Sequence, residues 1–146
     1  MSYLDIPNLY KNQDILRFRE CFALEKIHGT SAHIAFKDGV LRFFSGGSKH
    51  ESFVALFDPV ALLAAFVAIG QPEVVVFGEA YGGKLQGMKH VYGDRLRFIA
   101  FDVKVGELSW LSVPQAHEIT TRLGLEFVDY DLIPATIEAV DTHRSL

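Results

Sequence analysis

A lysine followed by a glycine three residues later stands in the segment EKIHGTS, which covers residues 25–31. A lysine amine can act as a covalent nucleophile, but only in its neutral form. At an ordinary pKa of ~10.4, only about one Lys26 side chain in two thousand is neutral at pH 7. Burial on an apolar strand, a bound Mg²⁺ or neighbouring cations would therefore have to lower this pKa. Taken by itself, a lysine at such a position is more often a solvated strand residue.

Further residues have side chains that could line a ligand site. Glu79 follows the apolar run VVVFG, and a carboxylate on an apolar strand needs a partner. Phe101 lies in the alternating segment RFIAFDV, where its ring is either core or a platform on which a base stacks. His28 is either a strand histidine with satisfied hydrogen bonds or a member of the Lys26 site. Asp102, next to Phe101, is expected on the opposite face of the strand in a structural role.

These residues fall on or just after expected strands. Asp38 and Gly39 stand between two β-rich runs, and this dipeptide favours a tight hairpin because both residues tolerate positive φ. Lys26 is therefore expected on, or just after, a strand that leads into a hairpin. The expected strands cover residues 20–27, 31–36, 40–44, 73–80, 95–105 and 126–130, with a hairpin partner at 107–112.

Helices are expected between these strands. The apolar run 60–70 reads as a buried helix, with Asp58 as its N-cap and Gly70 at its end. The pattern indicates an α+β class with a largely antiparallel sheet and packed helices, in a single domain over residues 1–146. Shorter helical segments are expected at 52–57, 113–125 and 134–143, and a glycine-rich loop at 81–94.

Composition excludes several classes of protein. The chain has 146 residues and is 49% hydrophobic, which is enough for a real core. Its longest apolar run is about half of the roughly 20 residues that a spanning helix needs. A lone Cys21 excludes an internal disulfide, and with no secretory signal at the start we expect a cytoplasmic protein. Residues 1–106 hold 12 bases and 11 acids, and the remainder 2 bases and 7 acids, so an anionic ligand is expected on the first part.

Three segments together resemble a known family. EKIHGTS at 25–31 resembles the lysine-x-x-glycine motif I of covalent nucleotidyltransferases, in the form used by ATP-dependent RNA ligases of the phage RNA ligase 2 type. VFGEAYGG at 76–83 is similar to motif III, and RFIAFDV at 97–103 to motif IIIa. The motifs come in family order over residues 20–103. The resemblance implies an adenylation domain that uses ATP and Mg²⁺ to join 5′-phosphate and 3′-hydroxyl RNA ends.

The resemblance also implies roles for individual residues. Lys26 would form the lysyl-AMP intermediate, and His28 would lie near the reacting phosphates, which Gly29 would let the backbone approach. Glu79 would accept hydrogen bonds from the ribose hydroxyls, and Phe101 would stack on adenine. Two further residues, Glu25 and Ile27, would line the base pocket. No metal ligand is identified, and Lys84 and Lys89 are either solvated or in contact with phosphate or RNA.

The sequence departs from the family pattern in three places. Ser31 stands where the family prefers asparagine, and the segment Ser45–Gly46–Gly47 replaces a basic motif that contains arginine, which leaves Lys49 as the nearby cation. Nothing after Asp102 resembles motifs IV and V. The chain is therefore a fragment, or a second polypeptide or C-terminal segment supplies these motifs, or it is a catalytically incomplete module that binds nucleotide or RNA ends. A DNA ligase or capping-type nucleotidyltransferase is a weaker alternative.

Overall fold

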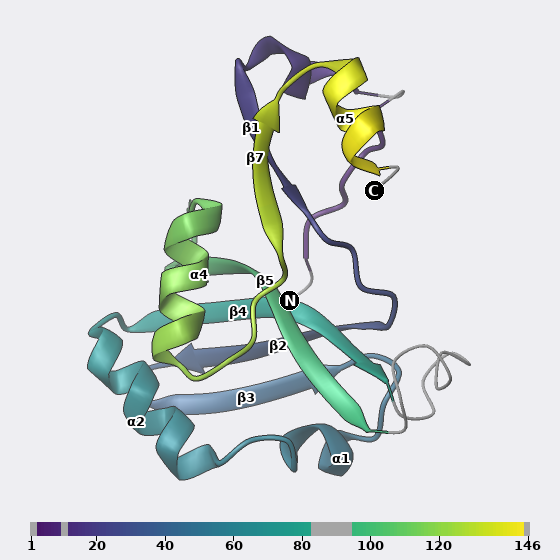
Figure 1. Cartoon of the computed structure of the whole chain (residues 1–146). Helices are drawn as coiled ribbons and strands as arrows, with labels where there is room; N and C mark the ends of the chain where they lie inside the picture. The colour runs from purple at the N-terminus through teal and green to yellow at the C-terminus, as the bar shows by residue number, and fades with distance from the viewer. Residues whose placement is uncertain (1–2, 10–11, 83–94, 145–146) are drawn as a thin grey trace. The chain divides into compact units, whose positions relative to one another are not determined.

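The computed structural model describes residues 3–9, 12–82 and 95–144. The chain forms two compact units, one made of residues 26–128 and the other of residues 1–25 with 129–146 (Figure 1). Both contain antiparallel strands, and helices accompany both, so the expected α+β class is confirmed. No helix within the described ranges is long and apolar enough to cross a membrane.

The larger unit is built on a five-stranded antiparallel sheet. Its strand order is β3-β2-β4-β5-β6 (Figure 1). Asp38 and Gly39 form the β2–β3 turn with φ of 49° and 81°, which confirms the hairpin expected from this dipeptide. The strands are β2 (Thr30–Lys37), β3 (Val40–Ser45), β4 (Glu73–Gly82), β5 (Leu96–Val105) and the short β6 (Ser109–Trp110).

One face of this sheet carries the core under its helices. Phe36 stacks on Phe66 with 5.3 Å between ring centroids, and Phe53 meets Phe98 edge to face at 5.7 Å. All four side chains are buried. Large aromatic rings bury much apolar area each, so they dominate the stability of this core. The helices of this unit are α1 (His50–Val54), α2 (Pro59–Ile69) and α4 (Val113–Arg122).

The helix ends follow local sequence rules. Asp58 accepts hydrogen bonds from the backbone N–H groups of Val60 and Ala61, both at 3.2 Å, and Gly70 ends α2 with a φ of 82°. Both ends of α2 are as predicted. A capping box at Ser112 and Gln115, which the sequence interpretation missed, starts α4.

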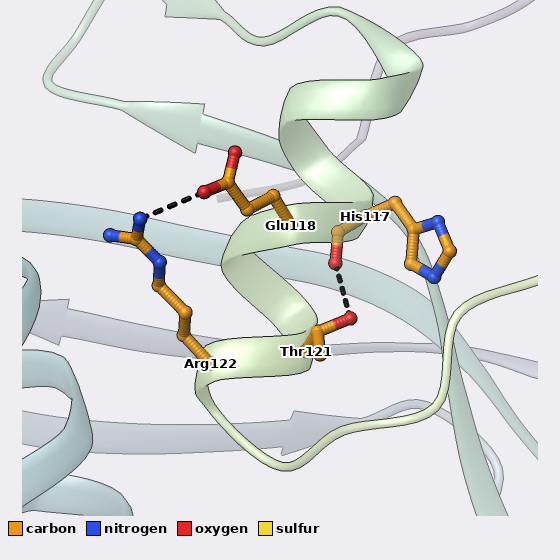
Figure 2. A network of polar contacts seen from close by, with 4 residues as sticks. All are labelled: His117, Glu118, Thr121 and Arg122. Atoms are coloured by element: carbon orange, nitrogen blue, oxygen red, sulfur yellow. Dashed lines mark hydrogen bonds and ion pairs between the residues drawn. The ribbon is translucent and has the colours of Figure 1, made fainter.

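The surface of α4 is held by interactions within the helix. Arg122 forms an ion pair with Glu118 at 2.8 Å, one turn earlier (Figure 2). The Thr121 hydroxyl donates to the carbonyl oxygen of His117 at 2.8 Å. Because these contacts are local and exposed, each stabilises the folded protein by only about 0.5 kcal/mol.

A β-bulge interrupts the pairing of β4 with β5. Phe77 pairs with Asp102 and Gly78 pairs with Ala100, which leaves Phe101 as the extra residue. A bulge shifts the side-chain alternation by one position. Strict alternation would put Asp102 on the core face with Ala100. Because directly paired residues share a face, Asp102 instead lies with Phe77 on the face opposite the core.

Gly78 is the residue that permits this bulge. A Cβ atom at Gly78 would lie 2.1 Å from the carbonyl oxygen of Ile99 and 2.8 Å from the ring of Phe98. Real Cβ atoms do not approach so closely, so no other residue type fits without a shift of β5.

The smaller unit is a two-stranded antiparallel ribbon with a helix. β1 (Glu20–Leu24) pairs with β7 (Tyr130–Pro134), accompanied by the 3₁₀ helix η1 (Asp14–Arg17) and by α5 (Ile137–Arg144). His143 on α5 contacts the carboxylate of Asp131 on β7 at 2.9 Å. This contact ties the helix to the ribbon.

The strand predicted at residues 126–130 is wrong. Within this range Phe127 forms only an isolated parallel bridge with Ala100, at the outer edge of β5, and β7 begins at Tyr130. The N–H of Ala100 donates to the carbonyl of Glu126, and that of Val128 to the carbonyl of Ala100, both at 2.9 Å. A pairing partner distant in sequence therefore decides where the strand forms, and the local β propensity of this segment does not.

Candidate active site

Lys26 lies in the extended segment between β1 and β2, two residues after β1 ends. Its side chain is exposed. The expectation that an apolar strand would bury the amine is therefore wrong.

Gly29 holds this segment against β4. A Cβ atom at Gly29 would lie 2.2 Å from the carbonyl oxygen of Ala80 and 3.0 Å from the Cβ of Tyr81. The two backbones approach so closely that only glycine fits. The backbone contact with β4 therefore explains the glycine at position 29 without any ligand, because this glycine sets the distance between the Lys26 segment and β4.

Glu79 lies beside this contact on β4. It pairs with Ser31 of β2 and Ile99 of β5, and its side chain is half-buried. Burial raises the pKa of the Glu79 carboxyl, and the positive charge of Lys26 opposes this rise. The two side chains are therefore close enough to interact electrostatically, although no ion pair within 4.0 Å joins them in the described part of the chain.

Phe101 lies on the strand next to Glu79, at the bulge, and its ring is half-buried. Because Glu79 pairs with Ile99, Phe101 is two residues along β5 from the residue opposite Glu79. Phe101 is the extra residue of this bulge, between the pairs Phe77–Asp102 and Gly78–Ala100, and bulges often redirect a side chain next to an active site.

The remaining predicted site residues are placed less closely together. Ile27 is half-buried and His28 exposed in the Lys26 segment. Glu25 ends the first of the two segments of the smaller unit, and its N–H donates to the carbonyl of Asp129 at 2.8 Å. Lys26 therefore lies within electrostatic reach of Glu79, whereas Glu25 belongs to the smaller unit. Lys84 and Lys89 lie outside the described residues.

Tyr81 and Arg97 also lie at this end of the sheet, and the sequence interpretation missed them. The Arg97 guanidinium stacks 5.6 Å from the centre of the Tyr81 ring, and it forms an ion pair with Glu126. Tyr81 is buried and its Cβ touches the Gly29 position. The only signal in the sequence was the two-residue spacing of Tyr81 from Glu79, which puts both side chains on one sheet face.

The loop after β3 packs on the start of β2. The hydroxyls of Ser45 and Ser48 are 2.6 Å apart, and the N–H of Gly46 donates to the carbonyl of Ser31 at 3.0 Å. Cβ atoms at Gly46 and Gly47 would each lie 3.0 Å from the Thr30 hydroxyl oxygen. The loop that replaces the family's basic motif therefore lies next to Thr30 and Ser31, beside the candidate site.

No protein-family model matches this chain, and no curated protein matches it. Solved structures match in fold. A variant of the Naegleria gruberi RNA ligase in its apo form gives a TM-score of 0.73 at 13% identity, over 92% of this chain and 42% of the ligase chain. Another variant of that ligase, with ATP and Mn, gives 0.68 at 12% identity, over 85% of this chain and 40% of the other. A protein described as Pmar-Lig_PreS3 gives 0.60 at 10% identity, over 94% and 37%.

At these identities the likeness concerns the fold. The α+β fold of this chain is shared with part of the Naegleria gruberi RNA ligase. The chain spans about two fifths of the length of these neighbours.

Proposed function

We propose that this chain carries the adenylation portion of an ATP-dependent RNA ligase of the phage RNA ligase 2 type, with Lys26 as the nucleophile. The main support is the electrostatic proximity of Lys26 and Glu79 beside β4, in a fold shared with RNA ligases. The chain spans about two fifths of its structural neighbours. A second chain or a C-terminal segment with motifs IV and V is therefore part of the proposal.

The first reaction step is proposed at Lys26. Its Nζ loses a proton and attacks the α-phosphorus of ATP; a P–N bond forms while the bond to the bridging oxygen breaks, and pyrophosphate leaves. An oxygen of the 5′-phosphate of an RNA end then attacks the same phosphorus, the P–N bond breaks to release the Lys26 amine, and a phosphoanhydride bond joins AMP to the RNA. A 3′-hydroxyl loses its proton and attacks the phosphorus of the RNA 5′-phosphate, a phosphodiester forms, and the phosphoanhydride bond breaks to release AMP. Such transfers depend mainly on positioning and charge stabilisation.

The other residues would position the nucleotide. Glu79 would accept hydrogen bonds from the ribose hydroxyls, and its half-buried carboxylate suits this role. Phe101 would stack on the adenine from its bulge, while Glu25 and Ile27 would line the base pocket. His28, exposed beside Lys26, would lie near the phosphates.

A divalent metal is proposed only together with ATP. The described residues contain no group of three or more His, Cys, Asp or Glu side chains suited to holding a metal ion. Mg²⁺ is often bound mainly through substrate phosphates, with one or two carboxylates and water. Mg²⁺ would therefore arrive with the nucleotide, bound mainly through its phosphates.

A catalytically incomplete module that binds nucleotide or RNA ends is the second candidate. The exposure of Lys26 favours it, because this chain does not supply the burial that would help deprotonate the amine. A DNA ligase or capping-type enzyme is the third candidate, and the EKIHGT form of the first motif weighs against it.

The intact mass of the protein after incubation with ATP and Mg²⁺ tests the proposal. We expect a gain of one AMP that is lost in Lys26→Ala and kept in Lys37→Ala, a matched control because Lys37 is also an exposed lysine. An adduct in Lys26→Ala would refute the assigned nucleophile. No adduct in a folded protein that still binds ATP would favour the binding module.

A further inference from the structure

A row of aromatic rings crosses the sheet on the face opposite the helices. The aromatic row consists of Phe44 on β3, His33 on β2, Phe77 on β4 and Trp110 on β6. Ring centroids are 5.1 Å apart between Phe44 and His33, 5.7 Å between His33 and Phe77, and 5.3 Å between Phe77 and Trp110. His33 pairs directly with both Phe44 and Phe77, so these rings share one face.

The row is accessible at its ends. Phe77 is buried, His33 and Trp110 are half-buried, and Phe44 is 46% exposed. Burial lowers the pKa of His33, so at neutral pH its imidazole is an uncharged ring. The row therefore offers exposed ring surface at Phe44 and partial ring surface at His33 and Trp110.

Cations flank the row. Arg42 pairs with Ala35 and so lies on the same face as His33, beside Phe44, and it is exposed. The Lys104 ammonium lies 5.4 Å from the centre of the Trp110 ring. Neither cation forms an ion pair in the described ranges. These two cations lie beside aromatic rings on one face of the sheet, which suits a ligand that carries both phosphates and bases.

We propose that the aromatic row, with Arg42 and Lys104, binds single-stranded RNA. Bases stack on exposed rings whatever their identity, and unpaired cations attract the backbone phosphates. The choice of RNA rests on the proposed function. Phe77 precedes Glu79 by two residues on β4, about 7 Å along the strand, so a bound strand would lie beside the proposed nucleotide site.

Binding of a fluorescein-labelled oligouridylate with a 5′-hydroxyl end, without ATP or metal, tests this surface. This probe cannot be adenylated or sealed at its 5′ end, so its binding is independent of ligase chemistry. We expect it to bind the full chain and to quench the emission of Trp110, the only tryptophan in the sequence.

Single substitutions then separate stacking from charge. Phe44→Ala is expected to weaken binding about 5- to 150-fold, the range that corresponds to loss of one base–aromatic stack. Arg42→Ala is expected to weaken binding and to reduce the salt slope by about one charge. Val67→Ala is the matched control, because Val67 is exposed on α2, which packs on the other face, and it should bind like the unmodified protein.

The outcomes are distinct from those of the adenylation test. No binding, binding that Phe44→Ala and Arg42→Ala leave unchanged, or equal loss in Val67→Ala would each overturn the inference. An AMP adduct with no oligouridylate binding would leave the proposed function standing and remove this surface. Oligouridylate binding in Lys26→Ala, with no adduct in the unmodified chain, would do the reverse.

Discussion

Two opposing influences act on the Glu79 carboxyl. Burial raises its pKa above the ordinary 4.5, and the nearby charge of Lys26 lowers it, with burial the larger effect. The folded state therefore binds the Glu79 proton more tightly than the unfolded state does. The contribution of Glu79 to the free energy of unfolding falls as pH rises from about the ordinary value through the folded pKa. An ionised Glu79 at neutral pH thus costs stability that a ligand hydrogen bond would offset.

Replacing this carboxyl with its neutral isostere should make the protein more stable. We expect Glu79→Gln to unfold at a higher temperature than the unmodified chain at pH 7, and the difference to disappear below about pH 4, where both side chains are uncharged. ATP affinity, measured by calorimetry, should fall in the same variant. Thermal unfolding at several pH values measures the first effect.

The variant Lys26→Ala tests whether the Lys26 charge stabilises the folded protein by compensating the Glu79 carboxylate. Removal of the neighbouring positive charge leaves the buried carboxylate less compensated, so this variant should be less stable at pH 7. A Glu79→Gln protein that is less stable than the unmodified chain at pH 7 would contradict the assigned balance.

Two glycines set the relative position of elements around the site. Gly29 permits the Lys26 segment to touch the backbone of β4, and Gly78 permits β5 to bulge at Phe101. Both contacts are between backbones that are distant in sequence. A side chain at either position would push apart elements that carry Lys26, Glu79 and Phe101.

Substitution of these glycines by alanine should therefore be costly. We expect Gly29→Ala and Gly78→Ala each to lower the free energy of unfolding by at least about 1–3 kcal/mol, the usual cost of overpacking. Gly70→Ala is the comparison, because its Cβ meets nothing within 4 Å and its cost comes only from a φ of 82°, about 1–2 kcal/mol. Urea unfolding measures all three.

Formation of the AMP adduct should distinguish Gly29 from Gly70 further. Gly29→Ala should reduce AMP adduct formation more than Gly70→Ala does at a temperature where both are folded, since only Gly29 adjoins Lys26 in the sequence. Equal adduct formation in the two variants would show that this contact does not position the nucleophile.

Local signals in the sequence predicted some elements and missed others. The Asp38–Gly39 turn and the caps of α2 depend on residues within a few positions of each other, and both were predicted. The bulge at Phe101 depends on how β4 and β5 meet, so the alternating pattern of residues 97–103 did not indicate it. The strand expected at 126–130 failed for the same reason, because its partner is not encoded nearby.

Charge and exposed apolar surface are unevenly distributed over the whole molecule. Residues 1–25 and 129–146 hold 8 acids and 4 bases, and residues 26–128 hold 10 of each. Of the 12 exposed large apolar side chains in the described parts, 7 belong to the smaller unit. Two-stranded ribbons are marginally stable alone, and their open edges and apolar faces invite a partner.

We therefore expect the chain on its own to associate at high concentration. Phe22 and Leu132 pair across the ribbon and are 37% and 55% exposed. Leu132→Ser should shift sedimentation velocity profiles toward the monomer, whereas Val60→Ser, 81% exposed on α2, should leave them unchanged. A monomer at every concentration, or an equal shift in both variants, would refute this expectation.

The contact between Gly29 and β4 also bears on how such a fold diverges. It is made by backbone atoms, and the one side chain it restricts is the absent one at Gly29. Because the backbone carbonyl of Ala80 makes this contact, the spacing between the Lys26 segment and the sheet does not itself depend on which side chain stands at that position. A spacing set by backbone atoms in this way tolerates wide change in the side chains around it.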